Sequence, residues 1–500
     1  MLLIHPPVAK PGEPPAGIAR LAGALRAHGL PCRLLDANLE GLLWLMEQPE
    51  PKADTWTRRA AKGRAGHLAA LRDPQTCRSP DRYVRAVRDL NRLLAVAGKE
   101  SGATVGLADY QQADFSPVSS AGLLRAAAEP ERNPFFPWFS RRLPELLDGV
   151  REVGISLNYL SQAVSAFAMI GFIRRRYPGL TVVLGGGLVT SWLRRPGWRN
   201  PFGGLVDHLV AGPGEEPLLA LLGAPAGPRQ PALPAYDLLP LADYLSPGHV
   251  LPYSAAGGCW WNRCSFCPER AEGNPYRPLP ASQALAELRA LSARYRPALI
   301  HLLDNALSPR LLRGLAENPP GAPWYGFARI DDTLADPDFC RALKRSGCVM
   351  LKLGLESGDQ GVLDRLRKGI DLGTAARVLE NLRLAGIAVY GYLLFGTPAE
   401  AEEDARRTLE FVVRHREAIT FLNLALFNMP AHGEEAADHG TDPFYEGDLS
   451  LYTGFRHPGG WERKQVRRFL DREFTRHPVV AAILRRDPPL FTSNHAPFFA

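Results

Sequence analysis

The sequence predicts an α/β protein made of two successive parallel-sheet units followed by a small C-terminal region. Three observations predict it. Short apolar runs alternate with segments at helical spacing from residue 2 onward, the alternation resumes at Val153, and a second such series begins at Leu299. The chain has 500 residues, which is too many for one ordinary core at roughly 100–200 residues per domain.

The first elements form a βαβ opening. An apolar run, Leu2 to His5, is ended by Pro6-Pro7, and a helix follows from Gly17, with Ile18, Leu21, Ala22 and Leu25 at helical spacing. Gly29 ends this helix, and Arg33–Asp36 predicts a second strand. Residues from about 45 to 145 are polar and Arg-rich. They predict a helical insertion, with one clear helix after Ser79-Pro80.

The β/α pattern then resumes and completes the first unit, residues 1–223. Strands are expected at 153–156, 181–184 and 205–209, with a helix over 163–176. Glycines follow two of these strands, at 185–187 and in the run Gly212-Pro-Gly-Glu215. Glycine lets backbone approach a ligand closely at this edge of an open sheet, although any one such loop is also explained by turn chemistry.

Residues 224–250 are Pro-rich and predict a linker. The second unit, residues 251–430, has expected strands at 299–303, 324–329, 349–353 and 389–395, and a further one at 420–424. Helical segments separate most of them, which predicts a parallel barrel or part of one. Residues 431–500 form a C-terminal extension of unassigned period.

Composition and charge exclude several classes of protein. Apolar residues make up 46% and charged residues 22%, which is typical of a globular chain. The net charge is +7 and the arginines are scattered along the sequence, which argues against a basic stripe that binds nucleic acid. No apolar run is long enough for a membrane span, and the amino terminus lacks the basic segment of a secretory leader. A cytoplasmic protein is expected.

The cysteines carry the strongest signal of chemistry. Three of the seven, Cys259, Cys264 and Cys267, lie within nine positions after an expected first barrel strand. Three thiolates can hold three irons of a [4Fe–4S] cluster and leave the fourth iron open. Zinc stays an alternative, although its structural sites take four protein ligands. Cys32, Cys77, Cys340 and Cys348 are scattered and are expected to be small apolar side chains.

With Phe266 before its last cysteine, this loop resembles the cluster motif of the radical S-adenosylmethionine (SAM) superfamily. The usual gaps there are three residues and then two, whereas this chain has four and then two. The resemblance implies a partial (β/α)6 barrel that binds SAM at its strand ends. The implied SAM contacts are Phe266, Asp304, Asn305, Arg329, Glu356, Ser357 and Gly396. The structural alternatives are a helix cap for Asp304 and ion pairs for Arg329 and Glu356. Glu400 is predicted to be a carboxylate at a helix N-terminus rather than a ligand.

The first unit resembles the Rossmann-like, flavodoxin-like cobalamin-binding domain often fused to such barrels. The implied corrin contacts are Pro7, Ser156, Leu157, Gln162, Gly185, Gly186, Gly187, Gly212, Gly214 and Glu215. The chain has no Asp-x-His-x-x-Gly stretch, and His208 has the wrong spacing for a cobalt ligand. The resemblance therefore implies cobalamin with an open lower face, or a fold that is retained without it.

Together these resemblances imply a B12-dependent enzyme that cleaves SAM reductively and methylates an unactivated carbon, or phosphorus. The alternatives are radical rearrangement or cyclisation, a cobalamin-independent radical SAM oxidoreductase, and, outside this class, a non-catalytic metal-binding sensor. The implied partners are a small-molecule or peptide substrate and an electron donor such as flavodoxin or ferredoxin. No membrane or nucleic-acid partner is expected, and no residue is assigned as catalytic acid or base.

Overall fold

The computed structural model describes residues 1–48, 54–224, 232–443, 447–488 and 495–499. The chain divides into two compact units. The first holds residues 1–250 with two short later segments, and the second holds most of residues 251–500. In the part of the chain that is described, no helix combines the length and the apolar character needed to cross a membrane.

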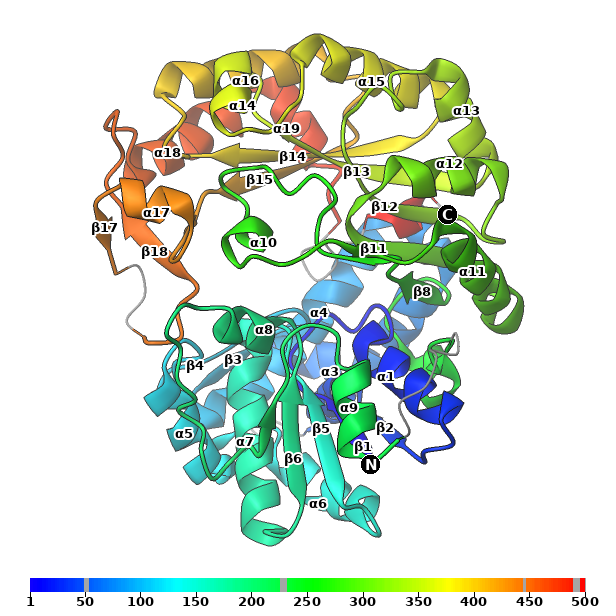
Figure 1. Ribbon diagram of the computed structural model, residues 1–500, viewed down its shortest axis with the longest axis vertical. Helices are drawn as coiled ribbons and strands as arrows, with labels where there is room; N and C mark the ends of the chain where they lie inside the picture. Colours follow the sequence, from blue (N-terminus) through cyan, green and yellow to red (C-terminus); the bar gives the residue numbers. More distant parts are fainter. Residues whose placement is uncertain (49–53, 225–231, 444–446, 489–494, 500) are drawn as a thin grey trace. The chain divides into compact units, whose positions relative to one another are not determined.

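The first unit is built on a five-stranded parallel sheet (Figure 1). Its strands are β1 (Leu2–His5), β2 (Arg33–Asp36), β5 (Glu152–Ser156), β6 (Thr181–Gly185) and β7 (His208–Leu209). The spatial order is β2-β1-β5-β6-β7, with every printed pairing parallel. Counted along this sheet, the order is 2-1-3-4-5, the flavodoxin-like arrangement whose ligands bind where the strand order reverses. The α/β prediction is confirmed.

Helices of this unit connect successive strands. They are α1 (Ala16–Ala27), α2 (Ala37–Leu45), α7 (Leu160–Arg176), α8 (Gly187–Leu193) and α9 (Glu215–Leu221). Strand β7 is shorter than the expected 205–209, because residues before it form a turn in which the amides of Leu205 and Val206 both donate to Phe202 O. Helix α7 packs on its neighbour so closely that a Cβ on Gly171 would lie 1.8 Å from Ala127 O.

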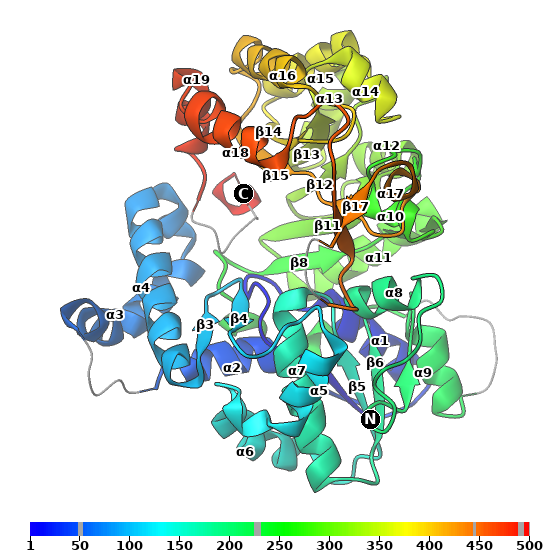
Figure 2. The same cartoon turned by 90° about the vertical axis from the view of Figure 1, so that its left-hand side faces the viewer.

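The segment between β2 and β5 is larger than one helix. The expected helix after Ser79-Pro80 is α4 (Pro80–Gly98), which buries Val87, Leu90 and Leu94. The sequence pattern missed α3 (Thr55–Arg72), which lies beside α4 (Figure 2), and the short hairpin β3 (Ala103–Val105) and β4 (Tyr110–Gln112). Helices α5 (Ser120–Ala128) and α6 (Phe136–Leu147) complete the segment.

The segment predicted as a linker is packed in its described part, residues 232–250. Ala235 N donates to Ala19 O at 2.8 Å, and the Tyr244 hydroxyl donates to Asp36 Oδ2 at 2.7 Å. Tyr236 is fully buried. Aromatic side chains therefore anchor this Pro-rich stretch to the first unit.

The second unit is a six-stranded sheet in sequential order, β15-β14-β13-β12-β11-β8. The strands are β8 (Val250–Tyr253), β11 (Leu299–Leu307), β12 (Trp324–Ala328), β13 (Cys348–Glu356), β14 (Ala388–Phe395) and β15 (Phe421–Leu426). From β11 to β15 each neighbouring pair is parallel. The covering helices are α11 (Ala281–Tyr295), α12 (Pro309–Glu317), α13 (Pro337–Arg345), α14 (Gln360–Arg365), α15 (Leu372–Ala385) and α16 (Glu402–Arg414). The predicted partial (β/α)6 barrel is confirmed.

Smaller elements border this sheet. Before α11 lie the strand pair β9 (Ala256–Gly257) and β10 (Arg277–Pro278), and α10 (Pro268–Ala271). After β15 come the three-stranded sheet β16 (Met429–Pro430), β18 (Tyr452–Phe455) and β17 (Thr441–Asp442), then α17 (Glu434–Asp438), α18 (Arg463–Phe469) and α19 (Pro478–Leu484). The aromatic tail packs on the barrel, where the His495 ring lies 4.3 Å from the Tyr390 ring.

Candidate functional site

The three-cysteine loop runs from β9 to α10 and is fixed by backbone and indole contacts. Gly258 has φ +73°, and a Cβ there would lie 2.5 Å from Pro275 O, so only glycine fits. The Trp260 indole N–H donates to Leu307 O, and that of Trp261 donates to Arg367 O, both at 3.3 Å. These contacts place the loop against the ends of β11 and α14.

The three thiols are half-buried and near enough to influence one another's charge. Burial raises the pKa of Cys264, and raises that of Cys267 to about 11; in both cases the other thiols add to the increase. Lys368 and Arg329 act in the opposite direction on Cys264. Soft thiolates beside two fixed cations are a donor set that fits an iron–sulfur cluster.

No group of three or more His, Cys, Asp or Glu side chains in the described residues is arranged to hold a single metal ion. A single ion gathers its ligands around one centre, whereas the cysteines of a cluster bind different irons. The three thiols of the loop and the charged side chains beside them are therefore compatible with a cluster.

Arg329 follows β12 and lies under the cysteine loop. Its Nη2 donates to Lys368 O at 2.6 Å and to Gly369 O at 3.1 Å, and its guanidinium carbon is 3.9 Å from the centre of the Trp261 ring. The side chain is buried. This arrangement leaves part of the guanidinium fork for a carboxylate, while stacking fixes its plane.

Glu356 ends β13 and is held in the left-handed region with φ +61°. Its Oε1 accepts from Lys368 Nζ at 2.7 Å, and both side chains are about nine-tenths buried. A Cβ on Gly354 would lie 2.5 Å from that same Oε1, so a side chain two residues earlier would displace the Glu356–Lys368 pair. A strained, non-glycine backbone at a strand end is a feature that functional sites often hold.

The remaining predicted SAM residues have different roles in the structure. Asp304 is buried and its Oδ2 accepts from Ala255 N at 3.0 Å, just before the cysteine loop. Asn305 is exposed and hydrogen-bonds Glu269. The Ser357 hydroxyl lies 3.2 Å from Thr408 Oγ1 and accepts from Asp359 N, so it supports the start of α14. The structure thus brings Arg329 and Glu356 together with the cysteines, while Ser357 faces away into α16.

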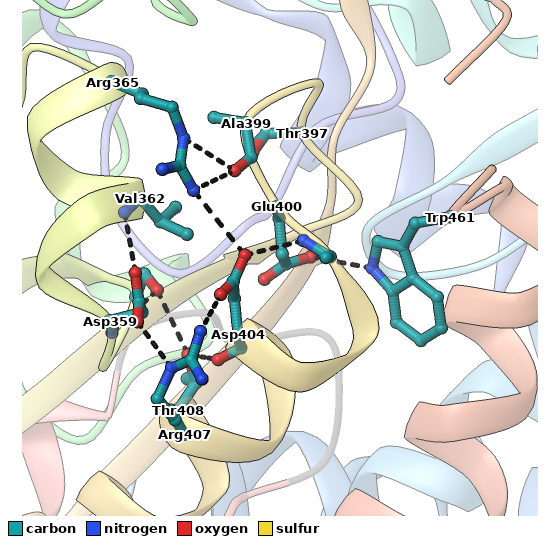
Figure 3. A network of polar contacts seen from close by, with 12 residues as sticks. Asp359, Val362, Arg365, Thr397, Ala399, Glu400, Asp404, Arg407, Thr408 and Trp461 are labelled. Carbon is teal, nitrogen blue, oxygen red and sulfur yellow. Dashed lines mark hydrogen bonds and ion pairs between the residues drawn. The ribbon is translucent and has the colours of Figure 1, made fainter. Parts of the chain in front are cut away.

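Gly396 follows β14 with φ +76° and is tied to the buried carboxylate of Glu400, which Figure 3 shows beside Trp461. Gly396 N donates to Glu400 Oε2 at 2.5 Å, and the Trp461 indole donates to the same oxygen at 3.1 Å. Glu400 Oε1 is buried and has no hydrogen-bond partner among the residues that the structure describes. His457 Nδ1 accepts from Trp461 N, which leaves Nε2 to donate to Thr397 O at 2.9 Å. Glu400 therefore closes the turn after β14.

Glu400 predicts a pH-dependent stability. Burial raises its pKa from 4.5 to about 7, against the opposing hydrogen bonds from Gly396 and Trp461. A raised carboxyl pKa contributes stability that is full below pH 4.5 and is lost as pH rises through 7. From pH 5 to pH 8, the unfolding free energy of Glu400→Gln should rise by roughly 3 kcal/mol relative to the native protein.

Denaturant unfolding at several pH values measures that difference. Glu410→Gln is the matched control, because Glu410 is exposed on α16, the helix that begins two residues after Glu400. A difference between Glu400→Gln and the native protein that stays constant with pH would contradict the assignment.

In the first unit, Gln162 joins the ends of β1 and β5. It is fully buried; its amide nitrogen donates to Pro6 O at 2.7 Å, and its Oε1 accepts from the amides of Asn158 and Tyr159. Pro7 and Leu157 are also buried. These three predicted corrin contacts are buried and support the carboxyl edge of the sheet at the point where the strand order reverses.

The glycine run after β6 separates into different roles. Gly186 has φ +109°, and a Cβ there would lie 2.4 Å from Leu157 O, so this glycine packs against its own sheet. Gly187 is exposed, and a Cβ there would have only ordinary contacts, the nearest at 3.7 Å. Gly185 is half-buried, and a Cβ there would have its nearest contact at 3.4 Å. Open backbone at this edge is thus offered by Gly187 rather than Gly186.

The other predicted residues lie at the same edge. Ser156 accepts from Asn158 Nδ2 at 3.1 Å, and Gly212 N donates to Thr190 Oγ1 at 2.9 Å. Gly214 precedes α9, and a Cβ there would meet Leu21 at 3.2 Å. Glu215 accepts from Arg20 Nε at 2.5 Å, which gives it a structural partner.

Sequence reasoning missed three residues of these sites. Tyr159 is 58% exposed at the end of β5, where a large ring on the surface is unusual. Lys368 lies twelve residues beyond its partner Glu356, and Trp461 lies sixty-one beyond Glu400. Tyr159 follows a strand that the sequence predicts, so it could have been found from the sequence. Lys368 and Trp461 are identified only by their tertiary contacts.

Three comparisons bear on these sites. A family model described as the radical SAM superfamily matches residues 253–412. The bacteriochlorophyllide d C-12(1)-methyltransferase of Chlorobaculum tepidum is 28% identical over 200 residues, 38% of this chain and 43% of that one. The chain therefore covers less than half the length of this curated relative.

The structure is also similar to that of the radical S-adenosylmethionine methyltransferase TsrM from Kitasatospora setae, solved with cobalamin and a [4Fe–4S] cluster bound. The TM-score is 0.52 at 16% identity, over 86% of this chain and 72% of that one. A second structure of TsrM, with tryptophan substrate and a SAM analogue, gives 0.50 at 17% identity, over 85% and 72%. At this identity the likeness concerns the fold.

Proposed function

We propose that the chain is a cobalamin-dependent radical SAM methyltransferase, because the radical SAM family model matches residues 253–412 and the fold is similar to that of TsrM. The observation that carries the proposal is the three-cysteine loop packed against Arg329, Lys368 and Glu356 at the ends of neighbouring strands. The proposed target is an unactivated carbon, or phosphorus, of a small molecule.

The proposed cofactors divide between the units. Cys259, Cys264 and Cys267 would hold a [4Fe–4S] cluster, and the carboxyl edge of the first sheet would hold cobalamin. When bound, the cluster supplies the electron that splits SAM, and cobalamin carries the methyl group. The protein's own task is to bind, orient and exclude water.

Polar groups at the barrel's strand ends would bind SAM. The guanidinium of Arg329, fixed on Trp261, offers paired donors for the amino-acid carboxylate. The Glu356 carboxylate, held by Lys368, keeps a second oxygen for a ribose hydroxyl. The Gly396 turn, closed by Glu400, presents backbone without a side chain to a flat adenine.

Aromatic side chains support a small-molecule substrate. Phe327 of β12 and Tyr392 of β14 lie with ring centroids 5.0 Å apart, and both are half-buried. TsrM was solved with tryptophan as its substrate. A half-buried aromatic pair on the two strands that flank β13 would suit a flat, apolar acceptor.

The decisive experiment is anaerobic reconstitution with iron, sulfide, cobalamin and SAM carrying a deuterated methyl group. Extracts lacking the enzyme supply acceptors, and mass analysis detects a product heavier by the labelled methyl. SAM cleavage without label transfer to any product would reject the methyltransferase and favour rearrangement. A protein that takes up zinc and never cleaves SAM would reject the enzyme as proposed.

A further inference from the structure

A groove between α11 and α12 has a volume of about 500 Å³ and is lined by arginines. Arg289 projects from α11, and Arg310 and Arg313 project from α12; all three are exposed. Many surface arginines of this chain have a carboxylate partner, as Arg142 has Glu40. Within the described residues, none of the three groove arginines has an ion pair. The lining also includes the exposed carboxylate of Glu317, so three arginines against one glutamate leave the groove with a net positive charge.

Residues that precede both helices of the groove contact the cysteine loop or the strand before it. Helix α12 follows Leu307, whose carbonyl accepts from Trp260, and Ser308, which hydrogen-bonds Tyr276. Helix α11 follows β10, and Arg277 of β10 pairs with Gly257, two residues before Cys259. The positive groove is thus connected to the cysteine loop through the residues that precede each helix.

We propose that this groove is the docking surface for an acidic one-electron carrier protein, of the flavodoxin class. The inference rests on the proposed function, since only a cluster in the loop needs such a donor. The carrier loses one electron and the cluster gains it, with no atom or proton transferred. Three arginines give long-range attraction for an acidic partner and orient it beside the loop.

The test compares two sources of electrons. In the variant Arg289→Gln/Arg310→Gln/Arg313→Gln, SAM cleavage driven by reduced flavodoxin should fall at least tenfold at low salt. Cleavage driven by dithionite should stay within twofold of the native protein, because a small reductant needs no docking. The matched control is Arg467→Gln/Arg468→Gln/Arg472→Gln, which removes three exposed arginines of the C-terminal segment. It should change neither rate.

Binding is a readout that does not depend on turnover. Flavodoxin affinity, measured by biolayer interferometry with the cluster-free and the loaded protein, should weaken about tenfold in the groove variant. The slope of affinity against salt should flatten too. Unchanged flavodoxin affinity and rate would overturn the docking surface. Loss of polyphosphate binding with flavodoxin binding retained would also overturn it, in favour of a small polyanion.

These outcomes separate the two proposals. If dithionite drives no cleavage in the native protein, the proposed function fails, and flavodoxin affinity alone then decides the docking surface. If dithionite-driven cleavage is intact and the groove variant responds to flavodoxin as the native protein does, only the docking surface fails.

Discussion

Replacing Cys259, Cys264 or Cys267 by alanine is expected to abolish SAM cleavage and methyl transfer, with activity at least a thousandfold lower. Each thiolate would hold one iron, so a loop with only two of the three cysteines would not retain the cluster. Iron per protein should fall to background after anaerobic reconstitution. Measurement of 5′-deoxyadenosine and of the methylated product checks the activity.

Cys348→Ser and Cys340→Ser are the controls, because these thiols are buried in the barrel wall away from the loop. Both should retain iron and cleave SAM. Cobalamin content should be unchanged in every cysteine variant, since the proposed corrin edge belongs to the other unit. A triple loop variant that still produced 5′-deoxyadenosine would show that the cluster assignment is wrong.

Replacing Gly187 by leucine is expected to reduce cobalamin retention at least tenfold without unfolding the protein. Gly187 is exposed at the start of α8, and its N–H still donates to Asn158 Oδ1 when a side chain is added. The leucine would stand on the edge where a flat corrin needs bare backbone. Absorbance after gel filtration measures the bound cobalamin, and iron content should not change.

Gly203→Leu is the matched control, because nothing lies within 4 Å of a Cβ at that position. It should retain cobalamin and melt within about 2 °C of the native protein, as surface substitutions do. Gly186→Leu should instead destabilise the unit, because its side chain would enter the Leu157 backbone. Full cobalamin retention in Gly187→Leu would place the corrin at another edge or remove it from the proposal.

The sheet of each unit was predictable because a buried parallel strand is a short apolar run that needs little context. β1, β5 and β6 follow from residues 2–5, 153–156 and 181–184 almost without change. The hairpin β3–β4 was missed because its strands have three residues each, too few to display a period of two. Helix α3 was missed because its exposed faces are rich in arginine and its apolar positions are mostly alanine.

The candidate site was predictable only where spacing along the chain carries the chemistry. The three cysteines form such a pattern, and so do the strand ends at Arg329 and Glu356. The partners of Arg329 and Glu356 do not follow from spacing along the chain. Lys368, which pairs with Glu356, lies beyond α14, and Trp261 of the cysteine loop stacks against Arg329. Gly186 and Gly187 look alike in sequence, yet φ and neighbouring backbone give them opposite roles. Tertiary contact alone separates them.

The position of β1 in the middle of the first sheet has a consequence for how the chain acquires its fold. Leu3 pairs with Gly154, so about 150 residues must be closed into a loop, at a chain-entropy cost of roughly 4 kcal/mol. During synthesis at ~5–20 residues per second, β1 is made roughly 8–30 s and β2 roughly 6–23 s before β5 exists to cover the other edge of β1. The amino-terminal strands therefore wait as a two-stranded ribbon with an open apolar edge, which makes the nascent chain a substrate for chaperones until residue 156 has emerged.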